Sequence, residues 1–118
     1  MHSRLKSFRY AIRGIVVTIR TQPNAKIHLG VAMLVVASGI FFRISPVEWC
    51  LVVLCIGLVL AAEAVNTAVE STIDLVSPEI HPLAGRAKDT AAGAVLLTSI
   101  AAAVVGSIIF WPYFRAIF

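Results

Sequence analysis

Four polar side chains follow one another at helical spacing at the end of a long apolar stretch of the chain. They are Glu63, Asn66, Glu70 and Asp74, at offsets of 3, 7 and 11 residues from the first. At about 100° per residue, these offsets place all four within an arc of roughly 80° on one helix face. Their oxygens are ligands that Mg²⁺ prefers, and a carboxylate can also take a proton from a hydroxyl group. This row is therefore the candidate functional site.

Three interpretations of the row are open from the residues alone. It could bind Mg²⁺ and a nucleotide, with Glu63 as general base on a hydroxyl and with Arg86 and Lys88 contacting phosphates. It could instead be an ion or proton path in a small transporter. It could also be a purely structural row of polar side chains whose hydrogen bonds are made to neighbouring subunits. The acids cluster at one end of an apolar span beside basic residues, which favours the first, because transporters usually bind near mid-membrane. Neither a Walker A loop nor a G-x-G-x-x-G pattern occurs, so any nucleotide site is built differently.

The composition indicates a membrane protein. Of the 118 residues, 59% are hydrophobic and only 14% are charged, whereas soluble domains carry about 25% charged residues. The formal net charge of +4 does not indicate a nucleic-acid partner, because long apolar runs occupy most of the chain. The excess positive charge fits membrane topology and contact with anionic lipid.

The periodicity predicts an all-α membrane protein of one domain, residues 1–118. An interfacial amphipathic helix over residues 3–22 carries apolar side chains on one face and basic ones on the other. Membrane-spanning helices are expected over residues 27–42, 47–76 and 90–111, and residues 77–85 are expected to form a loop because they contain two prolines and a glycine. The second helix, at roughly 45 Å, exceeds the hydrocarbon thickness of about 30 Å and should extend into the cytoplasm.

The basic residues predict the orientation. With three spans, eight of them fall on the side of the N-terminus and the 77–89 segment, and two fall on the other side. The eight are Arg4, Lys6, Arg9, Arg13, Arg20, Lys26, Arg86 and Lys88, against Arg43 and Arg115. The positive-inside rule therefore places the N-terminus and the polar row on the cytoplasmic side.

The polar row also carries a family resemblance. The pattern Glu63-x-x-Asn66-Thr-Ala-x-Glu70-x-x-x-Asp74, followed by His81, Ala87-Lys88-Asp89 and the Ala-Ala-Gly-Ala-Val run of residues 91–95, resembles the small prokaryotic integral-membrane lipid kinases. These form the diacylglycerol kinase and undecaprenol kinase family, and the resemblance extends from about residue 7 to the last span. It implies a surface helix with three transmembrane helices, assembled as a homotrimer with sites shared between subunits.

The resemblance implies an activity, cofactors and a location. The expected reaction is transfer of the γ-phosphate of ATP to diacylglycerol, giving phosphatidic acid, or to undecaprenol, giving undecaprenyl phosphate, with Mg²⁺ as cofactor. The expected location is the bacterial inner (cytoplasmic) membrane, as a multi-pass protein. Three segments resemble the undecaprenol kinase branch: residues 24–28, 44–49 and 91–95. Residues 85–89 resemble the diacylglycerol kinase branch, so the acceptor lipid stays open.

The resemblance also assigns roles by motif. Glu63 is expected to be the general base and Glu70 a metal ligand. The remaining motif residues are expected at the nucleotide or its phosphates: Asn66, Asp74, Glu79, His81, Lys88 and Asp89.

One position departs from the family pattern. Where the family usually has a glutamate just after the surface helix, as a second metal ligand, this chain has Gln22. An amide oxygen can still coordinate Mg²⁺, but the site loses a negative charge. Weaker metal binding is expected, and a catalytically weakened family member or a small ion-coupled transporter are the alternatives to an active kinase. His28 is interpreted as a satisfied polar residue at its helix entrance, with contact to a lipid headgroup or the nucleotide as the alternative. Glu48 is interpreted as an ordinary interfacial charge.

Overall fold

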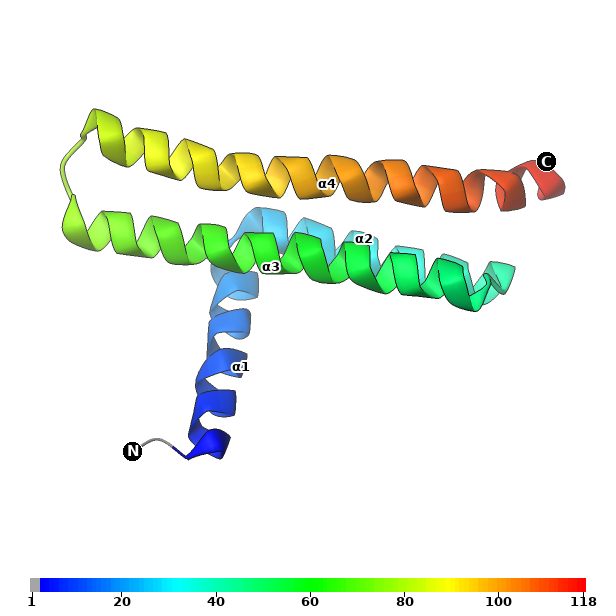
Figure 1. Ribbon diagram of the computed structural model, residues 1–118, viewed down its shortest axis with the longest axis horizontal. Coiled ribbons are helices and arrows are strands. Elements are labelled where there is room, and N and C mark those ends of the chain that lie inside the picture. Colours follow the sequence, from blue (N-terminus) through cyan, green and yellow to red (C-terminus); the bar gives the residue numbers. More distant parts are fainter. Residues whose placement is uncertain (1–2) are drawn as a thin grey trace.

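The computed structural model describes residues 3–118, which form four helices and no strand. The helices are α1 (Arg4–Thr21), α2 (Pro23–Phe42), α3 (Pro46–Val76) and α4 (Pro82–Ile117). Helices α2, α3 and α4 lie side by side, each antiparallel to the next in the chain, while α1 projects sideways from them (Figure 1). This confirms the predicted all-α class with a preceding N-terminal helix.

Three of the helices, α2, α3 and α4, are long and apolar enough to cross a membrane. Large apolar side chains along them are exposed, such as Phe41, Leu58 and Ile108, which suits contact with lipid rather than water. With 31 and 36 residues, α3 and α4 are about 46 Å and 54 Å long, beyond a hydrocarbon core of about 30 Å. Part of each helix must therefore project from the bilayer.

Two helices begin earlier than the sequence predicts. Helix α2 starts at Pro23 rather than at residue 27, and α4 starts at Pro82 rather than at residue 90. In both cases proline occupies the first turn, where its missing N–H breaks no helical hydrogen bond and its fixed φ suits the helix. As a result, Gln22 alone separates α1 from α2, and the predicted 77–85 loop contracts to residues 77–81.

Helix α4 also ends later than predicted. It continues through Pro112 to Ile117 instead of ending at Trp111. Proline removes a single helical donor, and membrane helices accommodate it when neighbouring groups restore the lost contacts. Tyr113, the next residue, anchors this end by donating a hydrogen bond to Glu48 at 2.6 Å.

The turn between α2 and α3 is tightly specified. Arg43 takes the left-handed conformation, with φ 53°, and its N–H contacts the carbonyls of Gly39 and Ile40. Ser45 then caps α3 in a reciprocal capping box with Glu48, which satisfies N–H groups at the helix start. Glu48 is therefore a structural anchor between the start of α3 and α4, not merely an interfacial charge.

A small apolar core lies at this end of the bundle. Its buried members come from the turn between α2 and α3 (Ile44), the start of α3 (Val52) and the end of α4 (Ile109 and Phe110), and Trp49 packs against them. The polar row of α3 lies at the opposite end, next to residues 77–81. The buried apolar cluster and the polar row thus lie at opposite ends of α3.

Replacing Gly39 should loosen this packing. A Cβ built on Gly39 would lie 2.7 Å from the Trp49 ring and 3.1 Å from Ile44, so Gly39→Ala forces the ring to move, with an expected cost of about 1–3 kcal/mol. Thermal unfolding in detergent should show a lower midpoint for this variant. Gly30→Ala on the same helix is the control, because nothing lies within 4 Å of its Cβ. Equal midpoints for the two variants would contradict the packing described.

Candidate active site

The polar row of α3 passes from a dry environment to a wet one. Glu63 is 1% exposed and Asn66 is 8% exposed. Glu70 is half-buried, and the Asp74 side chain is 65% exposed. The four side chains share one helix face, as predicted, but they differ in their exposure to solvent. The row can therefore present a desolvated carboxylate at one end and hydrated groups at the other.

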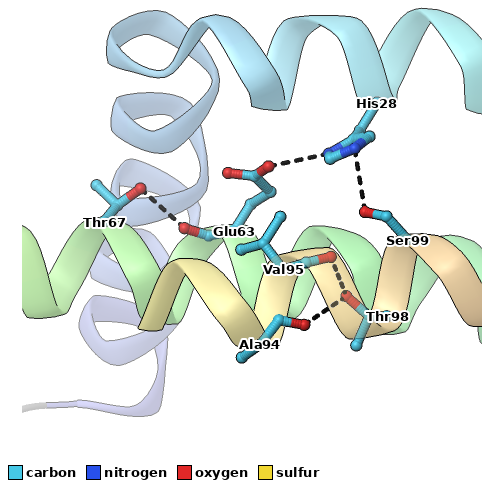
Figure 2. A network of polar contacts seen from close by, with 7 residues as sticks. All are labelled: His28, Glu63, Thr67, Ala94, Val95, Thr98 and Ser99. Carbon is cyan, nitrogen blue, oxygen red and sulfur yellow. Dashed lines mark hydrogen bonds and ion pairs between the residues drawn. The ribbon is translucent and has the colours of Figure 1, made fainter. Parts of the chain in front are cut away.

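Glu63 contacts α2 through a histidine. His28 Nδ1 lies 2.9 Å from Glu63 Oε1, and apart from each other neither atom has a hydrogen-bond partner in the described chain. The other ring nitrogen, Nε2, lies 3.2 Å from Ser99 Oγ on α4. Figure 2 shows the imidazole between the carboxylate and the hydroxyl, at a point where three helices meet. A buried carboxylate needs such a partner, because leaving it unpaired in a low dielectric is strongly unfavourable.

Asn66 lies one turn beyond Glu63 and has an unpaired hydrogen-bond acceptor in the described chain. Its Oδ1 is buried and has no hydrogen-bond partner within residues 3–118. Such an atom is uncommon, since buried polar groups are nearly always paired. Asn66 Oδ1 can therefore accept a hydrogen bond from a ligand or from a neighbouring subunit.

Glu70 contacts Gln22, the residue that connects α1 and α2. Gln22 Nε2 donates to Glu70 Oε2 at 3.3 Å, and both side chains are partly buried. Turning the amide over would present Gln22 Oε1 beside the same carboxylate, since the two amide orientations differ only in which atom faces the partner. Two oxygen donors fit a Mg²⁺ ion that takes its remaining ligands from water and phosphates. Residues 3–118 contain no group of three or more His, Cys, Asp or Glu side chains suited to a metal, so a metal at this pair would need most of its ligands from elsewhere.

Lys88 and Asp74 join the projecting ends of α3 and α4. Lys88 Nζ donates to Asp74 Oδ1, and the two side chains are 38% and 65% exposed. Exposed pairs of this kind are weak and exchange partners readily. The lysine is therefore held near the acidic row while remaining available to a phosphate.

The other predicted residues lie around the connection between these helices. Glu79 is exposed, and its backbone carbonyl accepts from the Ser77 hydroxyl. His81 caps α4, with Nδ1 accepting from the Leu83 N–H. Asp89 is exposed in the second turn of α4. None of these three is among the described contacts of Glu63 or Glu70.

The link from Glu63 to His28 and Ser99 was not predicted from the sequence. His28 is a satisfied polar residue, as the sequence predicts, but neither of its partners was predicted. Ser99 is not among the predicted residues, yet together the two side chains link Glu63 to α2 and α4. The available signal was a histidine and a serine inside predicted membrane spans, where each needs a polar partner. Their common partner could not be identified from the sequence, because it depends on how three helices face one another.

This arrangement can support proton abstraction beside a bound anion. Glu63 offers a desolvated carboxylate, Glu70 and Gln22 offer oxygen ligands two turns away, and Lys88 offers a positive charge. Lying at the end of apolar helices, the site can meet a hydroxyl in the membrane on one side and phosphates in water on the other. These are the components of phosphoryl transfer.

Comparisons with known proteins agree with this chemistry. The family model described as prokaryotic diacylglycerol kinase matches residues 9–110. The chain is 42% identical over 107 residues to the undecaprenol kinase of Bacillus subtilis, covering 91% of this chain and 87% of that protein. It is 40% identical over 109 residues to the diacylglycerol kinase of Synechocystis, covering 92% of this chain but 62% of that protein. It is 34% identical over 86 residues to the diacylglycerol kinase of Escherichia coli K12, covering 72% and 70% of the two chains.

Proposed function

The chain belongs to the prokaryotic diacylglycerol kinase family, and from this premise we propose that it is a lipid kinase that transfers the γ-phosphate of ATP to the hydroxyl of a membrane lipid alcohol. The observation that carries the proposal is the buried carboxylate of Glu63, positioned at the membrane end of the polar row of α3. The acceptor is undecaprenol or diacylglycerol, because relatives named for both lipids match the chain. Both lipids present a primary hydroxyl.

In the proposed reaction, Glu63 takes the proton from the lipid hydroxyl. The lipid oxygen then forms a bond to the γ-phosphorus, and the bond between that phosphorus and the bridging oxygen breaks, so that ADP leaves with the electron pair. Glu63 and Glu70 are separated by seven residues, about 10 Å along the helix axis. This separation leaves room for the transferred phosphoryl group between the acceptor hydroxyl and the metal ligands.

The solvent-exposed end of the row, from Glu70 to Asp74, is proposed to hold the nucleotide. Glu70 and Gln22 would hold Mg²⁺, which when bound neutralises charge on the phosphates. Lys88 would release Asp74 and bind a phosphate, while Asn66 would use its unpaired Oδ1 toward the substrate. The exposed residues Asp74, Glu79, His81 and Asp89 surround the space where the rest of the nucleotide would lie.

We also propose a location and an assembly. The three apolar helices and the family make this a multi-pass membrane protein. The distribution of basic residues supports insertion in the bacterial inner membrane, with the N-terminus and the polar row facing the cytoplasm. A homotrimer is proposed from the family resemblance, with neighbouring subunits completing each site.

A phosphoryl-transfer assay tests the activity and selects the acceptor. Purified protein in detergent micelles is supplied with MgATP labelled in the γ-phosphate and with undecaprenol, diacylglycerol or no lipid. We expect label in the lipid product for at least one alcohol, and the ratio of kcat/KM values identifies the preferred substrate. Absence of transfer to either lipid by folded protein would instead favour the weakened family member.

Removing the charge of Glu63 should abolish most turnover. Glu63→Gln keeps the size of the side chain but cannot take a proton, so kcat should fall by about 100-fold or more. The KM for ATP should change little, because the nucleotide lies at the other end of the row. Glu48→Gln is the matched control: it weakens the capping contacts at the start of α3 but lies at the far end of that helix from the site. Unchanged turnover in Glu63→Gln would remove Glu63 from the base role.

Restoring a carboxylate at position 22 should strengthen metal binding. Gln22→Glu adds a negative charge beside Glu70, so the Mg²⁺ concentration that gives half-maximal rate should fall several-fold. Asn24→Asp is the matched control, because it adds the same charge two residues away on an exposed position. Identical Mg²⁺ dependence in the wild type and Gln22→Glu would show that position 22 does not contact the metal.

A further inference from the structure

We propose that His28 is a positioning residue for Glu63, and that Ser99 fixes the imidazole tautomer that this role requires. The inference rests on the proposed function, since it concerns the same carboxylate. It assigns a task to two residues that lie outside the polar row.

The burial of Glu63 makes its one partner important. The side chain is 1% exposed, and His28 is its only ion-pair contact within residues 3–118. Lys88, the lysine nearest to the row in the fold, is paired with Asp74, eleven residues further along α3. A single imidazole therefore compensates the loss of solvation of this carboxylate. It also fixes which way the carboxylate points, because hydrogen bonds to charged groups are strong and directional.

The tautomer of His28 decides whether the ring can donate to Glu63. Neutral imidazole carries one N–H, and the hydrogen bond made by one ring nitrogen selects the role of the other. Ser99 Oγ lies 3.2 Å from Nε2. If the hydroxyl donates to Nε2, the ring proton resides on Nδ1, which faces Glu63 Oε1 at 2.9 Å. The order is then Ser99 O–H to His28 Nε2, and His28 Nδ1–H to Glu63.

The Ser99 hydroxyl differs in direction from other hydroxyls of α4. Those of Thr90, Thr98 and Ser107 donate back to carbonyls of their own helix. Thr98, directly next to Ser99, contacts the carbonyls of both Ala94 and Val95 (Figure 2). Ser99 instead reaches across to His28 on α2. Back-bonding to the i−4 carbonyl is the usual alternative for such residues inside a helix, so the contact with the ring replaces a bond that was locally available.

The surroundings of these three side chains strengthen their contacts. His28 and Ser99 line an apolar groove of about 990 Å³ between α2, α3 and α4, whose other lining residues are mostly Val, Ala, Ile and aromatic side chains. Apolar lining lowers the local dielectric, so each contact is stronger than on a wet surface. The Ser99–His28–Glu63 chain can therefore set the geometry of the base.

A kinetic test separates donation by His28 from simple space filling. His28→Ala removes the donor, and kcat should fall about 10- to 100-fold with KM for ATP within about twofold of wild type. His28→Asn keeps an amide N–H near the position of Nδ1, so it should recover most of the lost kcat. Ser99→Ala should lower kcat by about fivefold, while the control Ser107→Ala should not change it. Thermal midpoints of all variants are measured in the same micelles.

A spectroscopic test reads the tautomer without turnover. Nitrogen NMR of labelled protein in micelles, with the His28 signals assigned by their loss in His28→Ala, should show a proton on Nδ1 in the wild type. In Ser99→Ala the Nε2–H form should become populated. Because this measurement needs no lipid or ATP, it separates failure of the positioning role from failure of the kinase function.

Several outcomes would overturn the inference. Wild-type kcat in His28→Ala would show that the carboxylate needs no positioning by the ring. A His28→Asn variant that is folded but no better than His28→Ala would show that the donor is not the active feature. An Nε2–H tautomer in the wild type would reverse the order of contacts and exclude the role assigned to Ser99.

Discussion

The placement of a carboxylate among apolar helices is the constraint on which the rest of this structure depends. Glu63 is almost completely buried, and a carboxylate in such a place is tolerated only when a donor compensates its lost hydration. The donor, His28, comes from α2, and the ring is in turn held by Ser99 from α4. The three membrane helices must therefore come together at this level, and their mutual register is tied to the position of one acidic group.

The length of α3 gives the site a gradient of solvent exposure. Because α3 is longer than the bilayer is thick, its polar face continues from the buried Glu63 to the exposed Asp74. The prolines at the starts of α2 and α4 keep the connections short, which brings Gln22 beside Glu70 and Lys88 beside Asp74. Members of the row thus acquire partners from different elements. A lipid hydroxyl and a nucleotide need such different surroundings within one site.

Much of this could be predicted from the sequence, because the relevant signals are local. The helical spacing of Glu63, Glu70 and Asp74 and the lengths of the apolar runs predicted the row and the three spans. The starts of α2 and α4 were wrong because prolines that can end a helix can also begin one, and the choice depends on the residues after the proline and on their packing. The contact between His28 and Ser99 was missed for a different reason: the two residues are separated by 71 positions, and only the packing of the helices brings them together.

The amide at position 22 illustrates how the site balances charge. A carboxylate there would lie beside Glu70 in a half-buried position, and two like charges in contact repel unless a cation lies between them. Gln22 avoids this repulsion, and its N–H donates to Glu70 instead. The same amide lacks one of the charges that attract Mg²⁺. The hydrogen bond therefore holds the pair without metal, and the proposed Mg²⁺ site would form only if this bond between Gln22 and Glu70 were broken. Under the proposed function, the phosphates of the nucleotide would supply the missing negative charge, so binding of metal and binding of nucleotide would be coupled.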